Sequence, residues 1–412
     1  MTTLPSRRRD RHRWPRSAVL LSLVVATIAL VEILAIYVVL PGRAPTTFTA
    51  LQPDSISYIC HGLQLSWLDE ARSTELSSAL FDRFGYPPDS CARIDPIMPW
   101  QVIARPLLPG LIAVTSGVAP FPGAALLPSV AIFAGLVALW LVIVMPRNGR
   151  PGVTTWIAAI APFAAITMIL WPASVLTEGP VLGFSLAAIL LIAHRRRLDG
   201  LNVVTFTASL AIIGTLLLIT RPSWPLVGAM WSAGLVMIAL EHWKPRRVGA
   251  MLTVLSGLVA GYGMAIVLAR VIDVILVPPG LKERQKYVPE GLSASDLPEI
   301  AWSSITSTAN DIVIAIMQGD VVSPVLLIGG LVALVLLFRR RAWALAWVCT
   351  ISWALGFYAV GLVKVFDNAS RTHLRFLVPA TLMSIAAVLL ADRLESSAHP
   401  TAALGSSGPQ EP

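Results

Sequence analysis

Long apolar runs recur along almost the whole chain, and they restrict its fold more than any other feature. Most are near the length of roughly 20 residues that an α-helix needs to cross the hydrocarbon core of a bilayer. A transmembrane β-barrel would show short alternating segments instead. The sequence therefore predicts an all-α, polytopic helical membrane bundle of about ten transmembrane helices. The runs are 18–40, 124–145, 153–171, 181–194, 201–220, 225–240, 249–277, 322–338, 342–365 and 376–391.

Charge is scarce and unevenly placed. Of the 412 residues 56% are hydrophobic and 13% are charged, and the formal net charge is +8. Soluble domains are roughly a quarter charged. Basic residues gather in the arm 1–17 and after every second run, as in 195–197 and 339–341. Short basic segments of this kind mark cytoplasmic loops. The charge therefore predicts topology rather than nucleic-acid binding: a multi-pass cell-membrane protein in contact with lipids, with cytoplasmic N- and C-termini.

This topology puts two longer segments, 41–123 and 278–322, on the extracytoplasmic side. The first contains a mixed stretch, 61–84, typical of an amphipathic helix at the interface. It also contains a short apolar stretch, 106–118, which we expect to enter the interface without crossing. The predicted organisation is a basic cytoplasmic arm at 1–17, a transmembrane domain at 18–391 and a disordered cytoplasmic tail at 392–412.

Two of the three cysteines, Cys60 and Cys91, lie in the same outer loop. An extracytoplasmic location is oxidising, so these residues form either a disulfide or a pair of free thiols. Closing the loop would contribute about 3 kcal/mol in the chain-entropy model. No Cys/His spacing typical of a metal site occurs, so no metal ligand is predicted. The scattered outer acids permit a divalent cation as cofactor without requiring one.

Charged residues remain at the outer ends of the predicted helices once the basic clusters are set aside. A carboxylate can take the proton of an attacking hydroxyl, and arginine binds phosphate through its planar fork. The set therefore predicts chemistry on an anionic, lipid-borne substrate. A second possibility is left open for several members: an interface anchor, a solvated loop or a turn residue. The set is Asp54, Arg105, Glu178, Arg221, Lys282, Arg284, Lys286, Asp311, Asp320, Arg371, His373 and Arg375.

One acid, Glu32, lies inside the first apolar run rather than at its end. Ionisable groups within a membrane span are functional candidates. The alternative is a neutral or partnered Glu32 that faces the bundle.

Four segments of the chain resemble motifs of one known protein family. Asp54, four residues before Tyr58, resembles a catalytic acidic motif of the first outer loop. The segment 105–109, Arg-Pro-Leu-Leu-Pro, resembles a basic-Pro-Pro-Leu motif. The segment 177–180, Thr-Glu-Gly-Pro, resembles a second acidic position, and 371–379 resembles an Arg-Phe-type motif. In this order they resemble the GT-C superfamily of integral-membrane glycosyltransferases. That superfamily includes protein O-mannosyltransferases, aminoarabinose transferases of lipid A, and actinobacterial cell-envelope mannosyl- and arabinosyltransferases.

The resemblance implies a GT-C-like fold and an inverting hexosyl- or pentosyltransferase of cell-envelope biogenesis, a mannosyltransferase for example. Such an enzyme takes its sugar from a polyprenyl-phosphate donor and gives it to a glycan, lipid or protein acceptor at an extracytoplasmic site. Asp54 would be the general base or an acceptor ligand, with Glu178 assisting, and Arg105, Arg371 and Arg375 would hold the phosphate. The predicted site is catalytic Asp54 and Glu178 and substrate-binding Tyr58, Arg105, Arg221, Arg371 and Arg375.

Two departures from the family pattern are visible. Ser55 follows Asp54 where many members have a second acid, and Leu107 replaces the second proline of the basic motif. A different class of protein also fits the composition: a transporter, or a flippase or polymerase of lipid-linked glycans. Transporters favour broken helices and polar groups at mid-membrane. Here the charges gather at the ends of the runs, which favours the transferase.

Overall fold

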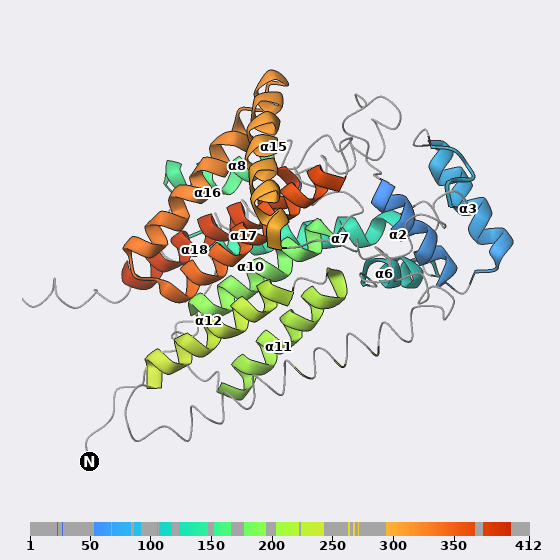
Figure 1. The fold of residues 1–412 in the computed structure, drawn as a ribbon. Helices are drawn as coiled ribbons and strands as arrows, with labels where there is room; N and C mark the ends of the chain where they lie inside the picture. The colour runs from blue at the N-terminus through green and yellow to red at the C-terminus, as the bar shows by residue number, and fades with distance from the viewer. Residues whose placement is uncertain are drawn as a thin grey trace, which may run out of the picture.

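The structure is a computed structural model whose described residues are helical wherever they form regular structure, with no strand among them (Figure 1). This confirms the predicted all-α class. The first predicted run, 18–40, and the seventh, 249–277, fall outside the description apart from single helical residues, and Glu32 lies outside it too. The described residues are 53–66, 68–83, 86–91, 105, 107–117, 123–146, 152–165, 177–194, 203–221, 224–242, 294–366 and 374–396, with Leu23, Thr27, Gly263, Val267 and Val271.

Eight helices coincide with predicted runs. They are α7 (Gly123–Val144), α8 (Val153–Ala164), α10 (Glu178–His194), α11 (Val203–Thr220), α12 (Trp224–His242), α16 (Val322–Arg339), α17 (Trp343–Phe366) and α18 (Val378–Ser396).

Five stretches within the described residues are long and apolar enough to cross a membrane. This supports a membrane protein, but it does not confirm the predicted number of about ten spans. Several of the other predicted spans are shorter helices, such as α8 and α10. The five stretches are Leu126–Val144, Leu297–Met317, Val322–Arg339, Trp343–Gly361 and Leu374–Asp392.

Helix α10 lies within the bundle and packs on α7, α11 and α18, while α17 packs on α12 and α18. Tryptophan side chains connect neighbouring helices. The indole N–H of Trp140 donates to the carbonyl of Ala158 at 3.2 Å, and that of Trp353 donates to the hydroxyl of Ser384 at 3.0 Å. Lipid tails are as apolar as leucine, so close packing and such hydrogen bonds hold a membrane bundle together.

Helix α15 (Leu297–Met317) occupies part of the segment 278–322, which the sequence assigned to an outer loop. Most of its large exposed side chains are apolar, Trp302 and Ile305 among them, whereas Ser304 and Asp311 are buried. A surface helix in water has the opposite polarity. The helix therefore suits a lipid environment. Its inward-facing polar residues interrupt the apolar run in the sequence, which is why the segment was predicted to be a loop.

Three shorter helices, α2 (Pro53–Gln64), α3 (Glu70–Arg83) and α6 (Leu107–Ser116), lie together at one end of the bundle, on the right in Figure 1. Helix α2 packs on α6, and α6 packs on α7. The exposed face of α3 is polar, with Arg72 and Glu75 forming an exposed ion pair. That face suits water, so α3 covers protein with its apolar side. Helix α6 rises only about 15 Å, half the hydrocarbon thickness of about 30 Å, so it is too short to cross.

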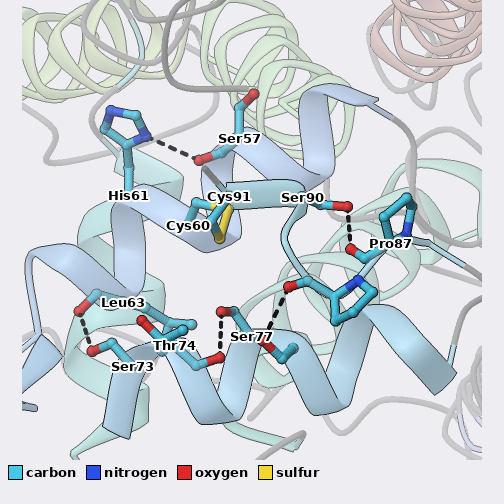
Figure 2. Close-up of a disulfide and its surroundings, with 12 residues drawn as sticks. Ser57, Cys60, His61, Leu63, Ser73, Thr74, Ser77, Pro87, Ser90 and Cys91 are labelled. Carbon is cyan, nitrogen blue, oxygen red and sulfur yellow. Dashed lines mark hydrogen bonds between the residues drawn. A yellow bond between two sulfur atoms is a disulfide. The ribbon is translucent and has the colours of Figure 1, made fainter. Parts of the chain in front are cut away.

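A disulfide joins Cys60 of α2 to Cys91, with the Cα atoms 5.6 Å apart (Figure 2). Of the two possibilities left open by the sequence, the structure therefore has the bridge. The Ser73 hydroxyl of α3 donates to the Leu63 carbonyl of α2 at 3.3 Å, and the Ser78 hydroxyl donates to the Pro88 carbonyl at 3.0 Å. Together these links tie α2, α3 and the segment 86–91 into one unit.

The opposite end of the bundle carries the basic group 339–341. There Arg340 forms an ion pair with Asp392 of α18. From the start of α18 at Val378 to Asp392 the helix rises about 21 Å. The predicted disordered tail was placed too early, because α18 continues to Ser396 and Asp392 is held by this pair. The part of the chain that the structure describes thus has two chemically distinct ends.

Candidate functional site

Five helical segments meet at the end of the bundle next to α2 and α6. The segments are α2, the start of α6, the start of α10, the end of α11, and the short helix η6 (Leu374–Leu377) that precedes α18. The local sequence explains why two of them end here. The acid and the proline of Glu178-Gly179-Pro180 suit the first turn of a helix, so α10 begins there. Arg221 follows the last residue of α11, and its N–H donates to the Leu217 carbonyl at 2.8 Å.

Arg221 and Glu178 form the ion pair at the centre of this cluster. Their nearest side-chain N and O atoms are 3.6 Å apart, and the Glu178 side chain is only 6% exposed against 26% for Arg221. The second carboxylate oxygen of Glu178, Oε2, is buried and has no hydrogen-bond partner among the described residues. A buried acceptor left in this state is uncommon and points to a missing donor.

Phe376 contacts two arginines through its ring. Its ring centroid is 5.3 Å from the guanidinium carbon of Arg221 and 4.7 Å from that of Arg375. Both distances are within the range of about 6 Å over which a cation is attracted to an aromatic face. The Phe376 ring is therefore a shared contact of two guanidinium groups that are far apart in the sequence.

A third arginine reaches the cluster from the start of α6. The Arg105 guanidinium donates to the Tyr58 hydroxyl of α2 at 2.8 Å, and the Tyr58 side chain is fully buried. This contact connects the disulfide-tied unit to the bundle. It is also the point at which two predicted substrate-binding residues touch.

The electrostatics confirm that these groups act on one another. Burial lowers the pKa of Arg221 below its ordinary value, and the charge of Arg105 lowers it further. Glu178 and Tyr58 oppose this effect, and Arg375 adds to it. The described side chains of the cluster therefore include three guanidinium groups and one carboxylate, and the carboxylate pairs with Arg221. The described side chains of the cluster thus carry more positive than negative charge, and guanidinium groups suit an anion such as phosphate.

Five of the predicted site residues are thus brought together: Tyr58, Arg105, Glu178, Arg221 and Arg375.

The other two predicted site residues have no described side chain. Arg371 lies outside the described residues. The backbone of Asp54 is in α2, one helical turn before Tyr58, and its side chain is outside the description. Their roles stay predictions.

Phe376 is the member of the cluster that sequence reasoning did not select. It sits beside Arg375, but its contact with Arg221 joins two distant parts of the chain, which no local pattern reveals. Gly356 of α17 supports it from behind. A Cβ atom at Gly356 would lie 2.8 Å from the Phe376 carbonyl, so glycine is needed for α17 to pack this closely on η6.

The other outer acids have structural surroundings of their own. Asp320 caps α16, accepting from the Ser323 N–H at 3.0 Å and from its hydroxyl at 2.6 Å. Asp311 is buried on α15. Residues 282–286 and His373 lie outside the described residues. Within the described ranges, no group of three or more His, Cys, Asp and Glu side chains is placed to hold a metal ion.

Comparison with known protein families, with curated proteins and with solved structures finds no match to this chain.

Proposed function

We propose that the protein is a membrane glycosyltransferase that moves a sugar from a polyprenyl-phosphate donor to an acceptor on the extracytoplasmic side. The observation that carries this proposal is the cluster of Arg105, Arg375 and the buried carboxylate of Glu178, all of which act on the charge of Arg221. The cluster has the sign and the chemistry for a phosphate group, since guanidinium groups pair with phosphate oxygens through two parallel hydrogen bonds. The apolar helices around it suit the lipid part of such a donor.

In this proposal the acceptor hydroxyl gives its proton to the Asp54 carboxylate and attacks the anomeric carbon of the donor sugar. The bond between that carbon and the phosphate oxygen breaks on the opposite face, so the configuration inverts. The leaving phosphate takes the bonding electrons and goes from one negative charge to nearly two. Arginines stabilise that developing charge more than the charge of the intact donor, which is what lowers the barrier.

In this scheme Glu178 does not act as a second base. Its carboxylate faces Arg221 at 3.6 Å and lies in the first turn of α10. It is therefore better suited to orient Arg221 than to deprotonate an acceptor. We assign Glu178 as the counter-ion of Arg221 and leave the base to Asp54.

The disulfide supports an extracytoplasmic side for the proposed site. Cys60 lies in α2, the same helix as Tyr58, so the bridge and the cluster share one end of the bundle. Disulfides persist in oxidising compartments. The opposite end of the bundle carries the basic group 339–341, including Arg340, and basic segments of this kind suit the cytoplasmic side. The proposed site thus faces outward, and its acceptor is a glycan, lipid or protein of the cell envelope.

The test is sugar transfer from a labelled polyprenyl-phosphate sugar by the full-length protein and by Arg105→Gln, Arg221→Gln and Arg375→Gln variants. Each change should lower kcat by about 10²–10³, the usual effect of removing one donor to a developing negative charge. The matched control is Arg72→Gln, because Arg72 is an exposed arginine of α3. Normal turnover in all three cluster variants, or none by the unaltered protein, would refute the proposal.

A transporter or flippase of lipid-linked glycans is the second candidate, and one observation favours it. Asp311 is buried, only 2% exposed, in the middle of α15, a helix that is long and apolar enough to span the membrane. Ionisable groups inside spans often mark transport pathways. Asp311→Asn separates the two functions: it should leave sugar transfer intact if the protein is a transferase. Uptake or flipping of a lipid-linked glycan that is lost in Asp311→Asn would favour the transporter.

A further inference from the structure

Phe376 carries no charge and no hydrogen-bonding group, yet it contacts two members of the arginine cluster. Arg375 precedes it in η6, and Arg221 reaches it from the end of α11. Its ring is 8% exposed, so little water competes for the contact. Desolvated cation–aromatic contacts are stronger than exposed ones. The ring is therefore a substantial part of what holds the two side chains.

Holding two arginines side by side is a specific physical problem. Their like charges repel, and Arg375 accordingly lowers the pKa of Arg221. A carboxylate would offset the repulsion, but it would also occupy N–H groups that an anion needs. An aromatic ring attracts both cations and offers no acceptor for the N–H groups. The ring therefore adds no acceptor of its own that would compete with a ligand for the arginine N–H groups.

We propose that Phe376 is a positioning residue that holds Arg221 and Arg375 ready for the phosphate of the lipid donor. This proposal rests on the function proposed above. Phe376 contacts Arg221 through an aromatic ring, whereas Glu178 pairs with Arg221 through a carboxylate oxygen. Gly356 of α17 fixes the backbone of Phe376 from the other side. A ring on a fixed backbone keeps the two arginines in place before the ligand arrives.

The experiment replaces Phe376 by 4-fluoro- and then 3,5-difluorophenylalanine in the full-length protein. Fluorine draws electron density from the ring face and leaves its shape nearly unchanged. We expect the dissociation constant of geranyl phosphate to rise stepwise, by roughly tenfold over the series, with Phe376→Leu as weak as the last member. The ligand-free melting temperature should fall stepwise as well, by about 2 °C. A purely packing role predicts no trend with fluorine content.

Phe81 provides the matched control, because it is fully buried and no guanidinium group of the described residues is stacked on it. The same series there should change neither quantity. A flat series at Phe376, in a protein that binds geranyl phosphate, overturns the positioning proposal and leaves the proposed function standing. If the unaltered protein does not bind geranyl phosphate, the proposed function fails. The role of Phe376 in positioning arginines for that phosphate then fails with it, whatever the ligand-free melting series shows.

Discussion

Arg221 is held in a charged state that the fold does not fully compensate. Burial is the main cause that lowers its pKa from the ordinary value for arginine. At neutral pH the side chain is protonated in both the folded and the unfolded protein. The resulting loss of stability is therefore fully present below the folded pKa, and it disappears only as the pH rises above the ordinary arginine pKa of the unfolded chain.

A bound anion should recover this stability, and it should do so independently of pH around neutrality. We expect geranyl phosphate at 100 times its dissociation constant to stabilise the protein by about 2.7 kcal/mol. The effect should be constant between about pH 7 and about pH 9, because arginine does not titrate there. Arg221→Gln should reduce the shift. Thermal melts with geranyl phosphate, and with uncharged geraniol as control, measure this. An equal shift with geraniol would mean that the lipid tail alone is bound.

The role of Glu178 can be separated from that of a base by Glu178→Gln. The change removes the only described carboxylate of the cluster and leaves its shape. We expect the free energy of unfolding to fall by about 1–3 kcal/mol, since Arg221 loses its partner. Affinity for geranyl phosphate should rise, because the anion no longer competes with Glu178. Glu75→Gln, at an exposed ion pair, is the neutral control. Lost transfer with unchanged affinity would instead support Glu178 as a catalytic acid or base.

Several site residues were predictable from the sequence because they lie at the ends of apolar runs. Arg221 follows the run 201–220, and Glu178 precedes the run 181–194. In a bundle with a fixed alternation of direction, such ends meet on one side, so their proximity follows from topology alone. The contacts of Phe376 do not follow from it, because which side chain contacts two arginines depends on packing.

Among the helices, α2 should lose the most stability when the disulfide is reduced. Cys60 fixes α2, and Tyr58 of the same helix receives the hydrogen bond of Arg105. Reduction removes a closure of sequence separation 31, which the chain-entropy model values at about 3–4 kcal/mol. We expect faster amide exchange in α2 and α3, weaker binding of geranyl phosphate, and little change in α10 and α18. Hydrogen exchange with and without reductant measures this.

A double Cys60→Ser, Cys91→Ser variant is the control for that experiment. It should show the faster exchange without reductant and should not respond further to it. The free cysteine, Cys349, is buried in the bundle, so it should not contribute. Unchanged exchange in α2 after reduction would mean that packing on α6 alone holds the helix.

Helix α15 shows where reasoning from apolar runs fails at the scale of elements. Residues such as Ser304 and Asp311 interrupt the apolar pattern, so the segment was assigned to a loop. These residues face the protein. The Ser304 hydroxyl donates to the Phe357 carbonyl of α17, and Gly361 admits the backbone of Ile300 at close range. The mean hydropathy of a segment cannot distinguish a helix whose polar face points inward from a polar loop. The apolar character of the exposed face in the structure does distinguish them.

At the scale of the whole molecule, the two ends should face opposite sides of the membrane, and α15 should face lipid. Single cysteines at Thr74, Arg341 and Trp302 test the three surfaces, since all three positions are exposed and Cys349 is buried. In intact cells a membrane-impermeant maleimide should label Thr74→Cys, on α3 at the same end of the bundle as the arginine cluster (Figure 1). It should label Arg341→Cys only after permeabilisation. Trp302→Cys should resist labelling in both conditions, because thiols react as thiolates and hydrocarbon does not support that charge.

Labelling of Arg341→Cys but not Thr74→Cys in intact cells would place the arginine cluster in the cytoplasm, where a donor sugar from an extracytoplasmic carrier is out of reach. Rapid labelling of Trp302→Cys would return α15 to the aqueous loop that the sequence first indicated.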